Sequence, residues 1–244
     1  MCIFEIVLND KNMEKSRVWL GVFIMIGLLF FGAMLPVSVK KYKSFDRTVT
    51  VKGLCEKEVK ADKVIWPIVI KVAGNDYASV YKQMEQQNET IRKFLVDGGI
   101  NPSDITLGTI EVSDARTDTY DNNRAMRFII KSITTVCSSE VDKVRELIAS
   151  QNKLIEKGVI LYSDWDSSIT YNYESLNDIK PAMVEEATKN ARAVGEKFAA
   201  DSDSRLGKIK TASQGTFSIT SRDSNTPWIK TVRVVNLVTY YIVD

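Results

Sequence analysis

Side chains that commonly carry out chemistry are sparse in this sequence. It has no histidine, and its three cysteines are Cys2, Cys55 and Cys137. The lack of histidine excludes Ser-His-Asp and Cys-His catalysis and removes the commonest zinc ligand. An odd number of widely spaced cysteines does not make a disulfide framework. The favoured interpretation of Cys55 and Cys137 is two small buried strand residues, with a mutual disulfide or redox sensing as alternatives.

One short segment, from Tyr162 to Asp166, places two carboxylates beside an indole. Aspartates at positions i and i+2 could work as an acid–base pair or bind a hard cation. A surface turn accounts for the same residues, and it is the favoured interpretation. We therefore assign no catalytic, cofactor-binding or metal-binding residue and expect that the chain is not an enzyme.

Two polar loops, residues 113–124 and 216–230, are candidates for contacts with a partner or a second copy. The first carries Tyr120, and the second carries Phe217 and Trp228. Loops on a rigid scaffold often hold binding residues, and aromatic side chains are enriched at interfaces. The alternative is that both are long solvated hairpin loops.

The composition is that of a folded domain. Of the 244 residues, 44% are hydrophobic and 26% are charged, which is typical of globular proteins. The formal net charge is +2. Because no strong field favours nucleic acid, we expect no nucleic-acid partner.

An uncharged apolar segment, residues 18–39, precedes this domain. As a helix it would be about 33 Å long, which is enough to cross a bilayer core of about 30 Å. A helix in the core of a domain is rarely apolar on every face. The segment is therefore predicted to be a transmembrane anchor, and a cleaved signal peptide is the alternative.

The flanks of the apolar segment bear on its orientation. Residues 1–17 would form a short cytoplasmic tail, with Met13 as an alternative start, and residues 40–47 would form a linker. Basic residues lie on both sides, so the positive-inside rule does not decide the orientation. A short basic region before the first apolar run usually stays inside. We therefore expect a single-pass protein of the inner membrane with its domain in the periplasm.

Residues 48–244 alternate between strand and helix patterns. Alternating apolar residues predict strands at 48–54, 64–72, 105–112, 126–137, 159–161, 168–173, 209–214 and 231–243. Apolar stripes at helical spacing predict helices at 77–97, from Ser139 onward, and from about 177 to 198. The stripe of the last helix comprises Val184, Ala187, Ala191, Val194 and Phe198. Pro67 predicts a sheet edge or a bulge, and Ser139 with Asp142 resembles a capping box.

The second half of this pattern repeats the first. Strand, long helix, strand, polar loop and long strand occur at roughly 64–137 and again at roughly 168–243. We predict an internally duplicated α+β domain with repeat halves of roughly 48–138 and 159–244. In this fold, antiparallel sheets pack against two long amphipathic helices.

Four segments in this order resemble the SIMPL-domain family of bacterial cell-envelope proteins. They are RTVTVKG at 47–53 followed by EKEVKAD at 56–62, GGINPSDI at 98–105, SSEVDKVRELI at 138–148, and the Ala-rich helix 182–200 running into RLGKI at 205–209. The resemblance implies an exported or anchored protein with a duplicated α+β fold that assembles into oligomers. It also implies a link to tolerance of oxidative stress, and it carries no catalytic motif.

The sequence therefore predicts a non-enzymatic, membrane-anchored envelope protein that self-assembles or binds partners. The membrane contact would be made by residues 18–39, and a homo-oligomer is expected. The alternative is a small-molecule or peptide binding or sensor module with a pocket between the duplicated halves. The ligand of such a pocket is not evident from the sequence.

Overall fold

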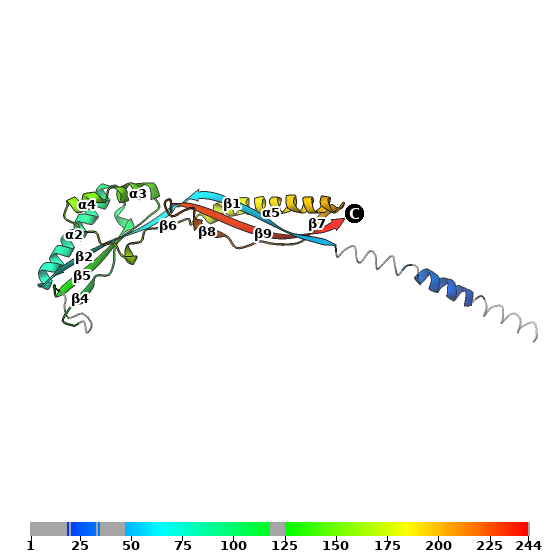
Figure 1. Ribbon diagram of the computed structural model, residues 1–244, viewed down its shortest axis with the longest axis horizontal. Helices are drawn as coiled ribbons and strands as arrows, with labels where there is room; N and C mark the ends of the chain where they lie inside the picture. The colour runs from blue at the N-terminus through cyan, green and yellow to red at the C-terminus, as the bar shows by residue number, and fades with distance from the viewer. Residues whose placement is uncertain (1–18, 20, 33, 35–46, 118–124, 244) are drawn as a thin grey trace, which may run out of the picture. The chain divides into compact units, whose positions relative to one another are not determined.

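The computed structural model describes residues 19, 21–32, 34, 47–117 and 125–243 (Figure 1). Two antiparallel sheets and several helices confirm the predicted α+β class. The strands are β1 (Thr48–Lys60), β2 (Lys63–Gly74), β3 (Ile105–Leu107), β4 (Glu111–Asp114), β5 (Phe128–Ser138), β6 (Thr170–Asn172), β7 (Arg205–Ser213), β8 (Ser218–Ser221) and β9 (Ile229–Val243). The helices are α2 (Tyr77–Asp97), α3 (Val141–Ala149), α4 (Asn152–Glu156) and α5 (Leu176–Asp201), with 3-10 turns η1 (Pro102–Asp104) and η2 (Trp165–Ser167).

The chain divides into two compact units, which are described separately. The first comprises Met1–Leu54, Ala187–Gly215 and Val235–Asp244. The second comprises Cys55–Glu186 and Thr216–Val234. The long strands β1 and β9 and the helix α5 each contribute residues to both units.

The second unit contains a five-stranded antiparallel sheet in the order β3-β5-β2-β6, with β4 also paired to β5. Pro67 of β2 lies opposite Thr135 in a continuous register, so the predicted bulge is absent. The pairing with β6 covers only Lys63 to Ile65. Pro67 thus lies beyond the part of β2 that pairs with β6. This position suits proline because it has no N–H to donate to a neighbouring strand. The edge prediction is confirmed locally.

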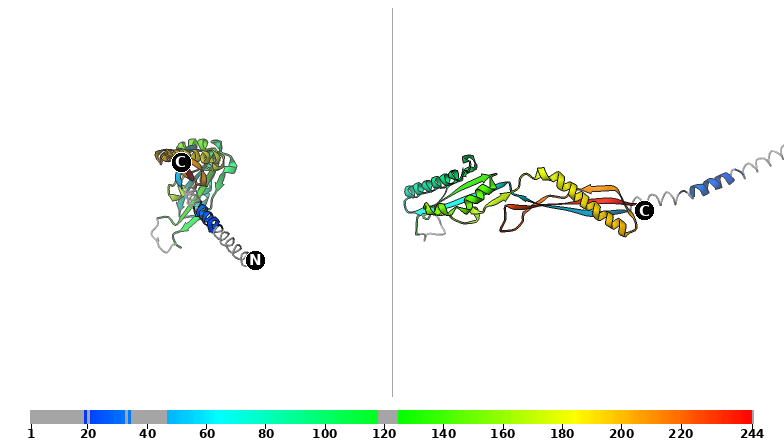
Figure 2. Two further views of the ribbon diagram at one scale, coloured as in Figure 1. Left: turned by 90° about the vertical axis from the view of Figure 1, so that its right-hand side faces the viewer. Right: turned by 90° about the horizontal axis from the view of Figure 1, so that it is seen from above.

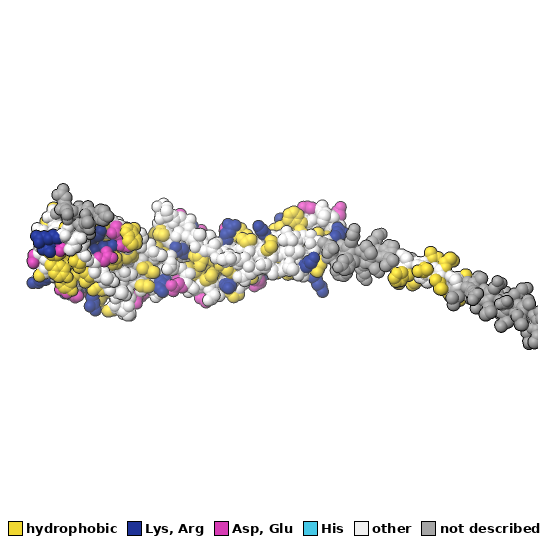
Figure 3. Space-filling view, turned by 90° about the horizontal axis from the view of Figure 1, so that it is seen from below, with side chains coloured by type: hydrophobic (Ala, Val, Ile, Leu, Met, Phe, Trp, Pro, Cys, Tyr) yellow, Lys and Arg dark blue, Asp and Glu magenta, His cyan; other side chains and the backbone are white. Residues whose placement is uncertain are grey.

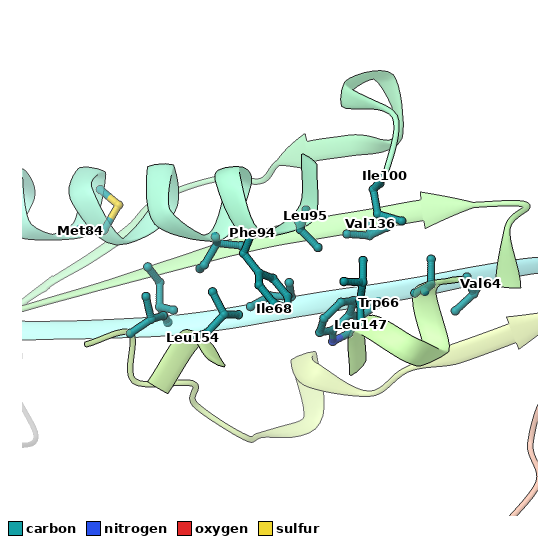
Figure 4. Close-up of a cluster of buried hydrophobic side chains, with 14 of the residues drawn as sticks. Val64, Trp66, Ile68, Met84, Phe94, Leu95, Ile100, Val136, Leu147 and Leu154 are labelled. Atoms are coloured by element: carbon teal, nitrogen blue, oxygen red, sulfur yellow. The ribbon is translucent and has the colours of Figure 1, made fainter. Parts of the chain in front are cut away.

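Helix α2 lies on one face of this sheet and contributes five buried residues to the core (Figure 4). Its predicted apolar stripe is confirmed, since five of its members are buried: Val80, Met84, Ile91, Phe94 and Leu95. The Asp76 side chain accepts the Ser79 N–H at 3.0 Å and begins the helix. At the other end, Gly99 has φ +82°, and the buried Ile100 donates its N–H to the Leu95 carbonyl.

The first unit is built from β1, β9, β7 and α5, which lie side by side (Figures 1 and 2). Its core contains Val51, Ala191, Val238 and Tyr240. The α5 residues that face the strands are small: Ala187, Ala191, Gly195 and Ala199 are buried. Small side chains spaced four apart let the helix backbone approach the sheet closely.

Gly53 of β1 lies at the closest point of this approach. A Cβ atom there would lie 2.7 Å from the Ala191 Cβ and would also collide with the Ala187 carbonyl oxygen. Only glycine fits, because the nearest obstacle is backbone and cannot rotate away. The sequence RTVTVKG therefore places glycine where the helix crosses the strand.

The predicted stripe of α5 is partly wrong. Ala187 and Ala191 are buried, but Val194 is 38% exposed and Phe198 is 56% exposed. The buried positions are spaced four residues apart, which is slightly more than one helical turn. The row of residues that contacts the strands therefore winds slowly around the helix. Val194 and Phe198 consequently fall beside the row, and the small residues Gly195 and Ala199 fall within it.

Two predicted strands differ from the structure. Residues 159–161 form no strand, and a single bridge joins Leu161 to Ile70. The strand predicted at 105–112 breaks into β3 and β4 at Gly108, whose N–H donates to the Ile133 carbonyl at 2.7 Å. Val159, Ile105 and Ile110 pack on the core, but in each case the chain soon turns away, so the ladder stays short.

Two further details are corrected. The capping box predicted from Ser139 and Asp142 is not formed, because Glu140 occupies the N-cap of α3 and makes no side-chain cap hydrogen bond. Instead the Ser138 hydroxyl accepts the Glu140 N–H at 3.3 Å. The predicted polar loop 216–230 contains a short strand, β8, paired with β9.

The predicted N-terminal segments fall mostly outside the described residues. Residues 1–17 and 40–46 lie outside them, and the predicted anchor at 18–39 is covered only in part, with residues 21–32 helical. Within the part of the chain that is described, no helix combines the length and the apolar character needed to cross a membrane.

Candidate functional site

The three aromatic residues predicted at interface loops have different surroundings. Tyr120 lies outside the described residues. Phe217 is half-buried next to β8, with the Lys180 Nζ 5.9 Å from its ring centroid. Trp228 is half-buried and packs on the core of the second unit, with the Arg145 guanidinium 3.6 Å from its ring centroid. Its carbonyl also accepts the Ala61 N–H at 2.8 Å, so Trp228 holds β9 to the end of β1.

The segment from Tyr162 to Asp166 is the turn that the sequence predicts, and it is tightly fixed. It leads into η2, where the Asp164 carboxylate accepts the Asp166 N–H at 2.9 Å. The Ser167 hydroxyl accepts the Asp164 N–H at 3.0 Å, which completes a capping box. This reciprocal pair of hydrogen bonds fixes the direction in which the side chain of Trp165 leaves the turn.

Both carboxylates of the turn contact lysines from the sheet. Lys71 of β2 and Lys131 of β5 are direct cross-strand neighbours, an arrangement that would be repulsive without counter-charges. Lys131 Nζ donates to the Asp166 carboxylate, and Lys71 Nζ lies 3.5 Å from Asp164 Oδ2. The hydrogen bond to Asp166 raises the pKa of Lys131. The two aspartates are therefore occupied by ion pairs and are poorly suited to acid–base work.

Sequence reasoning missed these lysine partners. Lys131 precedes Asp166 by 35 residues, and the register of β2 against β5 brings Lys71 and Lys131 together. The one available signal was a lysine among the apolar residues of each of two strands, Lys71 in β2 and Lys131 in β5. Such a pair on one face of a sheet needs acidic partners.

Four large apolar side chains between residues 155 and 165 are exposed. Trp165 is 84% exposed and Ile160 is 71% exposed, with Ile155 at 57% and Tyr162 at 43%. We call these four residues the tryptophan surface. Lys71 Nζ lies 3.5 Å from the centroid of the Tyr162 ring, and Lys131 Nζ lies 5.8 Å from that of Trp165. Figure 3 shows one face of the second unit, where exposed hydrophobic side chains lie among charged ones.

A hollow of about 290 Å³ adjoins the tryptophan surface. Ile155 and Tyr162 form one side of it, and Pro67 of β2 lines it as well. The hollow lies beside the stretch of β2 that β6 does not cover. A surface with exposed aromatic and aliphatic groups next to a concavity has the features of a protein contact site.

The two cysteines of the domain are free thiols. Cys55 is 2% exposed, and its Sγ donates to Glu186 Oε2 at 3.3 Å. Burial, together with the nearby Glu186 carboxylate, raises the pKa of Cys55 to about 11. The interpretation as a buried strand residue is confirmed for Cys55, whereas Cys137 of β5 is only half-buried. A redox sensor needs a thiolate, which Cys55 does not supply near neutral pH.

We expect Cys55 to resist alkylation in the folded protein. At pH 8 a thiol of pKa about 11 is ionised about two orders of magnitude less than an ordinary cysteine of pKa about 8.5. Mass spectrometry after timed treatment with iodoacetamide measures the rate, with the urea-unfolded chain as the reference. Rapid labelling of Cys55 in the folded protein would contradict the assignment.

Comparison with known proteins places the chain among domains without an assigned activity. The family model SIMPL, described as a protein of unknown function (DUF541), matches residues 49–230. No curated protein matches the chain. The matched segment includes most of both sheets, the tryptophan surface and the half-buried Trp228.

Proposed function

The chain belongs to the SIMPL family, and from this premise we propose that it is a non-enzymatic, membrane-anchored envelope protein that self-assembles or binds partner proteins. Residues 18–39 would anchor it in the inner membrane, with the domain in the periplasm and a contribution to stress tolerance. The support for the anchor is the uncharged apolar run, whose helical length matches a bilayer core.

Strand pairing supports the proposal that the domain is a duplication with halves of roughly 48–138 and 159–244. In one sheet β5 has β2 on one side and β3 and β4 on the other. In the other sheet β9 is paired with β1 and also with β7 and β8. The long helix and long last strand of one half, α2 and β5, would then correspond to α5 and β9 of the other, with β3 and β4 corresponding to β7 and β8. The first strand of each half would lie in the sheet of the other.

The observation that carries the proposed contact function is the exposure of Trp165. An indole that is 84% exposed forfeits favourable burial unless something covers it. Tryptophan is also the residue most enriched among those that dominate binding energy. Because the capping box and the ion pairs of Lys71 and Lys131 hold the turn in place, binding would cost little conformational entropy.

We expect Trp165→Ala to disrupt assembly without unfolding the domain. Truncating an interface tryptophan commonly weakens binding by about 2 kcal/mol or more, which is roughly a thirtyfold loss in affinity. Full-length protein in lipid nanodiscs, studied by native mass spectrometry or pull-down, reports the complexes. Phe198→Ala is the matched control, since Phe198 is 56% exposed but lies in the first unit.

Two outcomes would contradict this function. In the first, wild-type protein remains strictly monomeric at high concentration and captures no envelope protein. In the second, Trp165→Ala and Phe198→Ala behave alike. In either case the exposed tryptophan would have another explanation.

The alternative function, binding of a small molecule or peptide, was predicted for a pocket between the duplicated halves. The larger hollow described by the structure is lined by residues from 81 to 134, which all belong to the first predicted half. A ligand in that hollow would therefore contact only the first predicted half.

A further inference from the structure

A groove of about 530 Å³ runs along α2 in the second unit. Helix α2 forms one wall, with Tyr81, Glu85 and Arg92 along its length. The other wall is formed by η1 and β3, where Leu107 is 54% exposed. This volume is within the range typical of ligand sites, about 300–1,000 Å³.

The floor of the groove contains an unsatisfied hydroxyl group. Thr134 of β5 is 3% exposed, and its Oγ1 has no hydrogen-bond partner among the described residues. Thr134 lines the groove and lies opposite Leu107 in the sheet register. Its neighbour on the same face, Ser132, is satisfied by Asn88 at 3.0 Å. Buried polar groups are normally paired, so the Thr134 hydroxyl points to a ligand with a hydrogen-bonding group.

The two ends of the groove carry opposite charges. Glu85, Glu89 and Arg92 all line it. Glu89 pairs with Lys93, whereas neither Glu85 nor Arg92 has an ion-pair partner among the residues described. They lie seven residues apart on α2, which is about 10 Å along the helix axis. The charge of the Glu85 carboxylate also raises the pKa of the neighbouring Tyr81, which lines the same wall.

These features together match a short extended peptide. Three residue steps of extended chain cover about 10 Å, so a tetrapeptide spans the distance from Glu85 to Arg92. We propose that this groove binds short peptides with free termini, with the ammonium group near Glu85 and the carboxylate at Arg92. A backbone group of the peptide would pair with Thr134 Oγ1, and an aliphatic side chain would pack on Leu107. This site is independent of the tryptophan surface.

The test uses full-length protein in nanodiscs and the tetrapeptide Ala-Val-Ala-Leu with free termini, titrated by calorimetry or NMR. Binding should be saturable. Arg92→Gln should weaken it about tenfold, since hydrogen bonds to charged groups contribute about 1.5–3 kcal/mol. Amidation of the peptide carboxylate should weaken binding similarly. Lys153→Gln is the matched control, because Lys153 of α4 is exposed and does not line the groove.

Thr134→Val separates binding from folding. It should weaken peptide binding about threefold to tenfold while leaving the melting temperature unchanged or raised, because it removes a buried unsatisfied hydroxyl. The proposal is overturned if the tetrapeptide does not bind, if the amide binds as well as the acid, or if Arg92→Gln leaves affinity unchanged. Saturable binding of decanoate without binding of the peptide would also overturn it and would indicate a site for linear amphiphiles.

Discussion

Gly53→Ala is expected to unfold the first unit or to destabilise it severely. The new methyl group would lie 2.7 Å from the Ala191 Cβ and would collide with the Ala187 carbonyl oxygen. Overpacking typically costs about 1–3 kcal/mol, and an obstacle made of backbone should place this change at or above the top of that range. The measurement is thermal or urea denaturation followed by circular dichroism.

Gly158→Ala is the matched control for Gly53→Ala. Gly158 has φ +81° and no atoms within 4 Å of an added Cβ, so alanine there suffers only from backbone strain of about 1–2 kcal/mol. If Gly53→Ala were as stable as wild type, or no worse than Gly158→Ala, the close packing of α5 on β1 would be refuted.

Leu95→Ala should destabilise the second unit by about 2–5 kcal/mol, the usual range for truncating a buried leucine. Leu95 is fully buried in the cluster between α2 and the five-stranded sheet (Figure 4). The loss combines removed apolar burial with the cavity left behind. Urea denaturation measures it as a lower midpoint with an unchanged slope.

The adjacent residue supplies the control for Leu95→Ala. Val96 lies on the same turn of α2 but is 39% exposed, so Val96→Ala should change stability by less than about 1 kcal/mol. Equal losses from both substitutions would mean that the helix presents a different face to the sheet.

The two long helices differ in how well the sequence predicts which of their residues are buried. The stripe of α2 could be predicted because its buried residues are large and apolar, and polar residues occupy the opposite face. The stripe of α5 was predicted less well because its buried residues are small: Gly195 and Ala199 carry little hydropathy signal, whereas Phe198 carries a strong one and is exposed. Because α5 approaches β1 closely at Gly53, the buried positions of α5 need small side chains and not large apolar ones.

The family and the fold class could be predicted from the sequence, but the surface features could not. Trp165 was recognised as part of a turn, yet its exposure depends on partners distant in sequence, Lys71 and Lys131. The groove along α2 likewise depends on Thr134, a residue that looks like an ordinary strand position until its hydroxyl is found without a partner. Pairing between strands determines both features, and a single sequence contains no direct record of it.

Photo-crosslinking at position 165 in intact cells tests the proposed contact function most directly. A photoreactive amino acid in place of Trp165 of the full-length chain should give a covalent adduct larger than the monomer on irradiation, and the same amino acid in place of Phe198 should not. Adducts from neither position, or equal adducts from both, would show that the tryptophan surface is not a contact site.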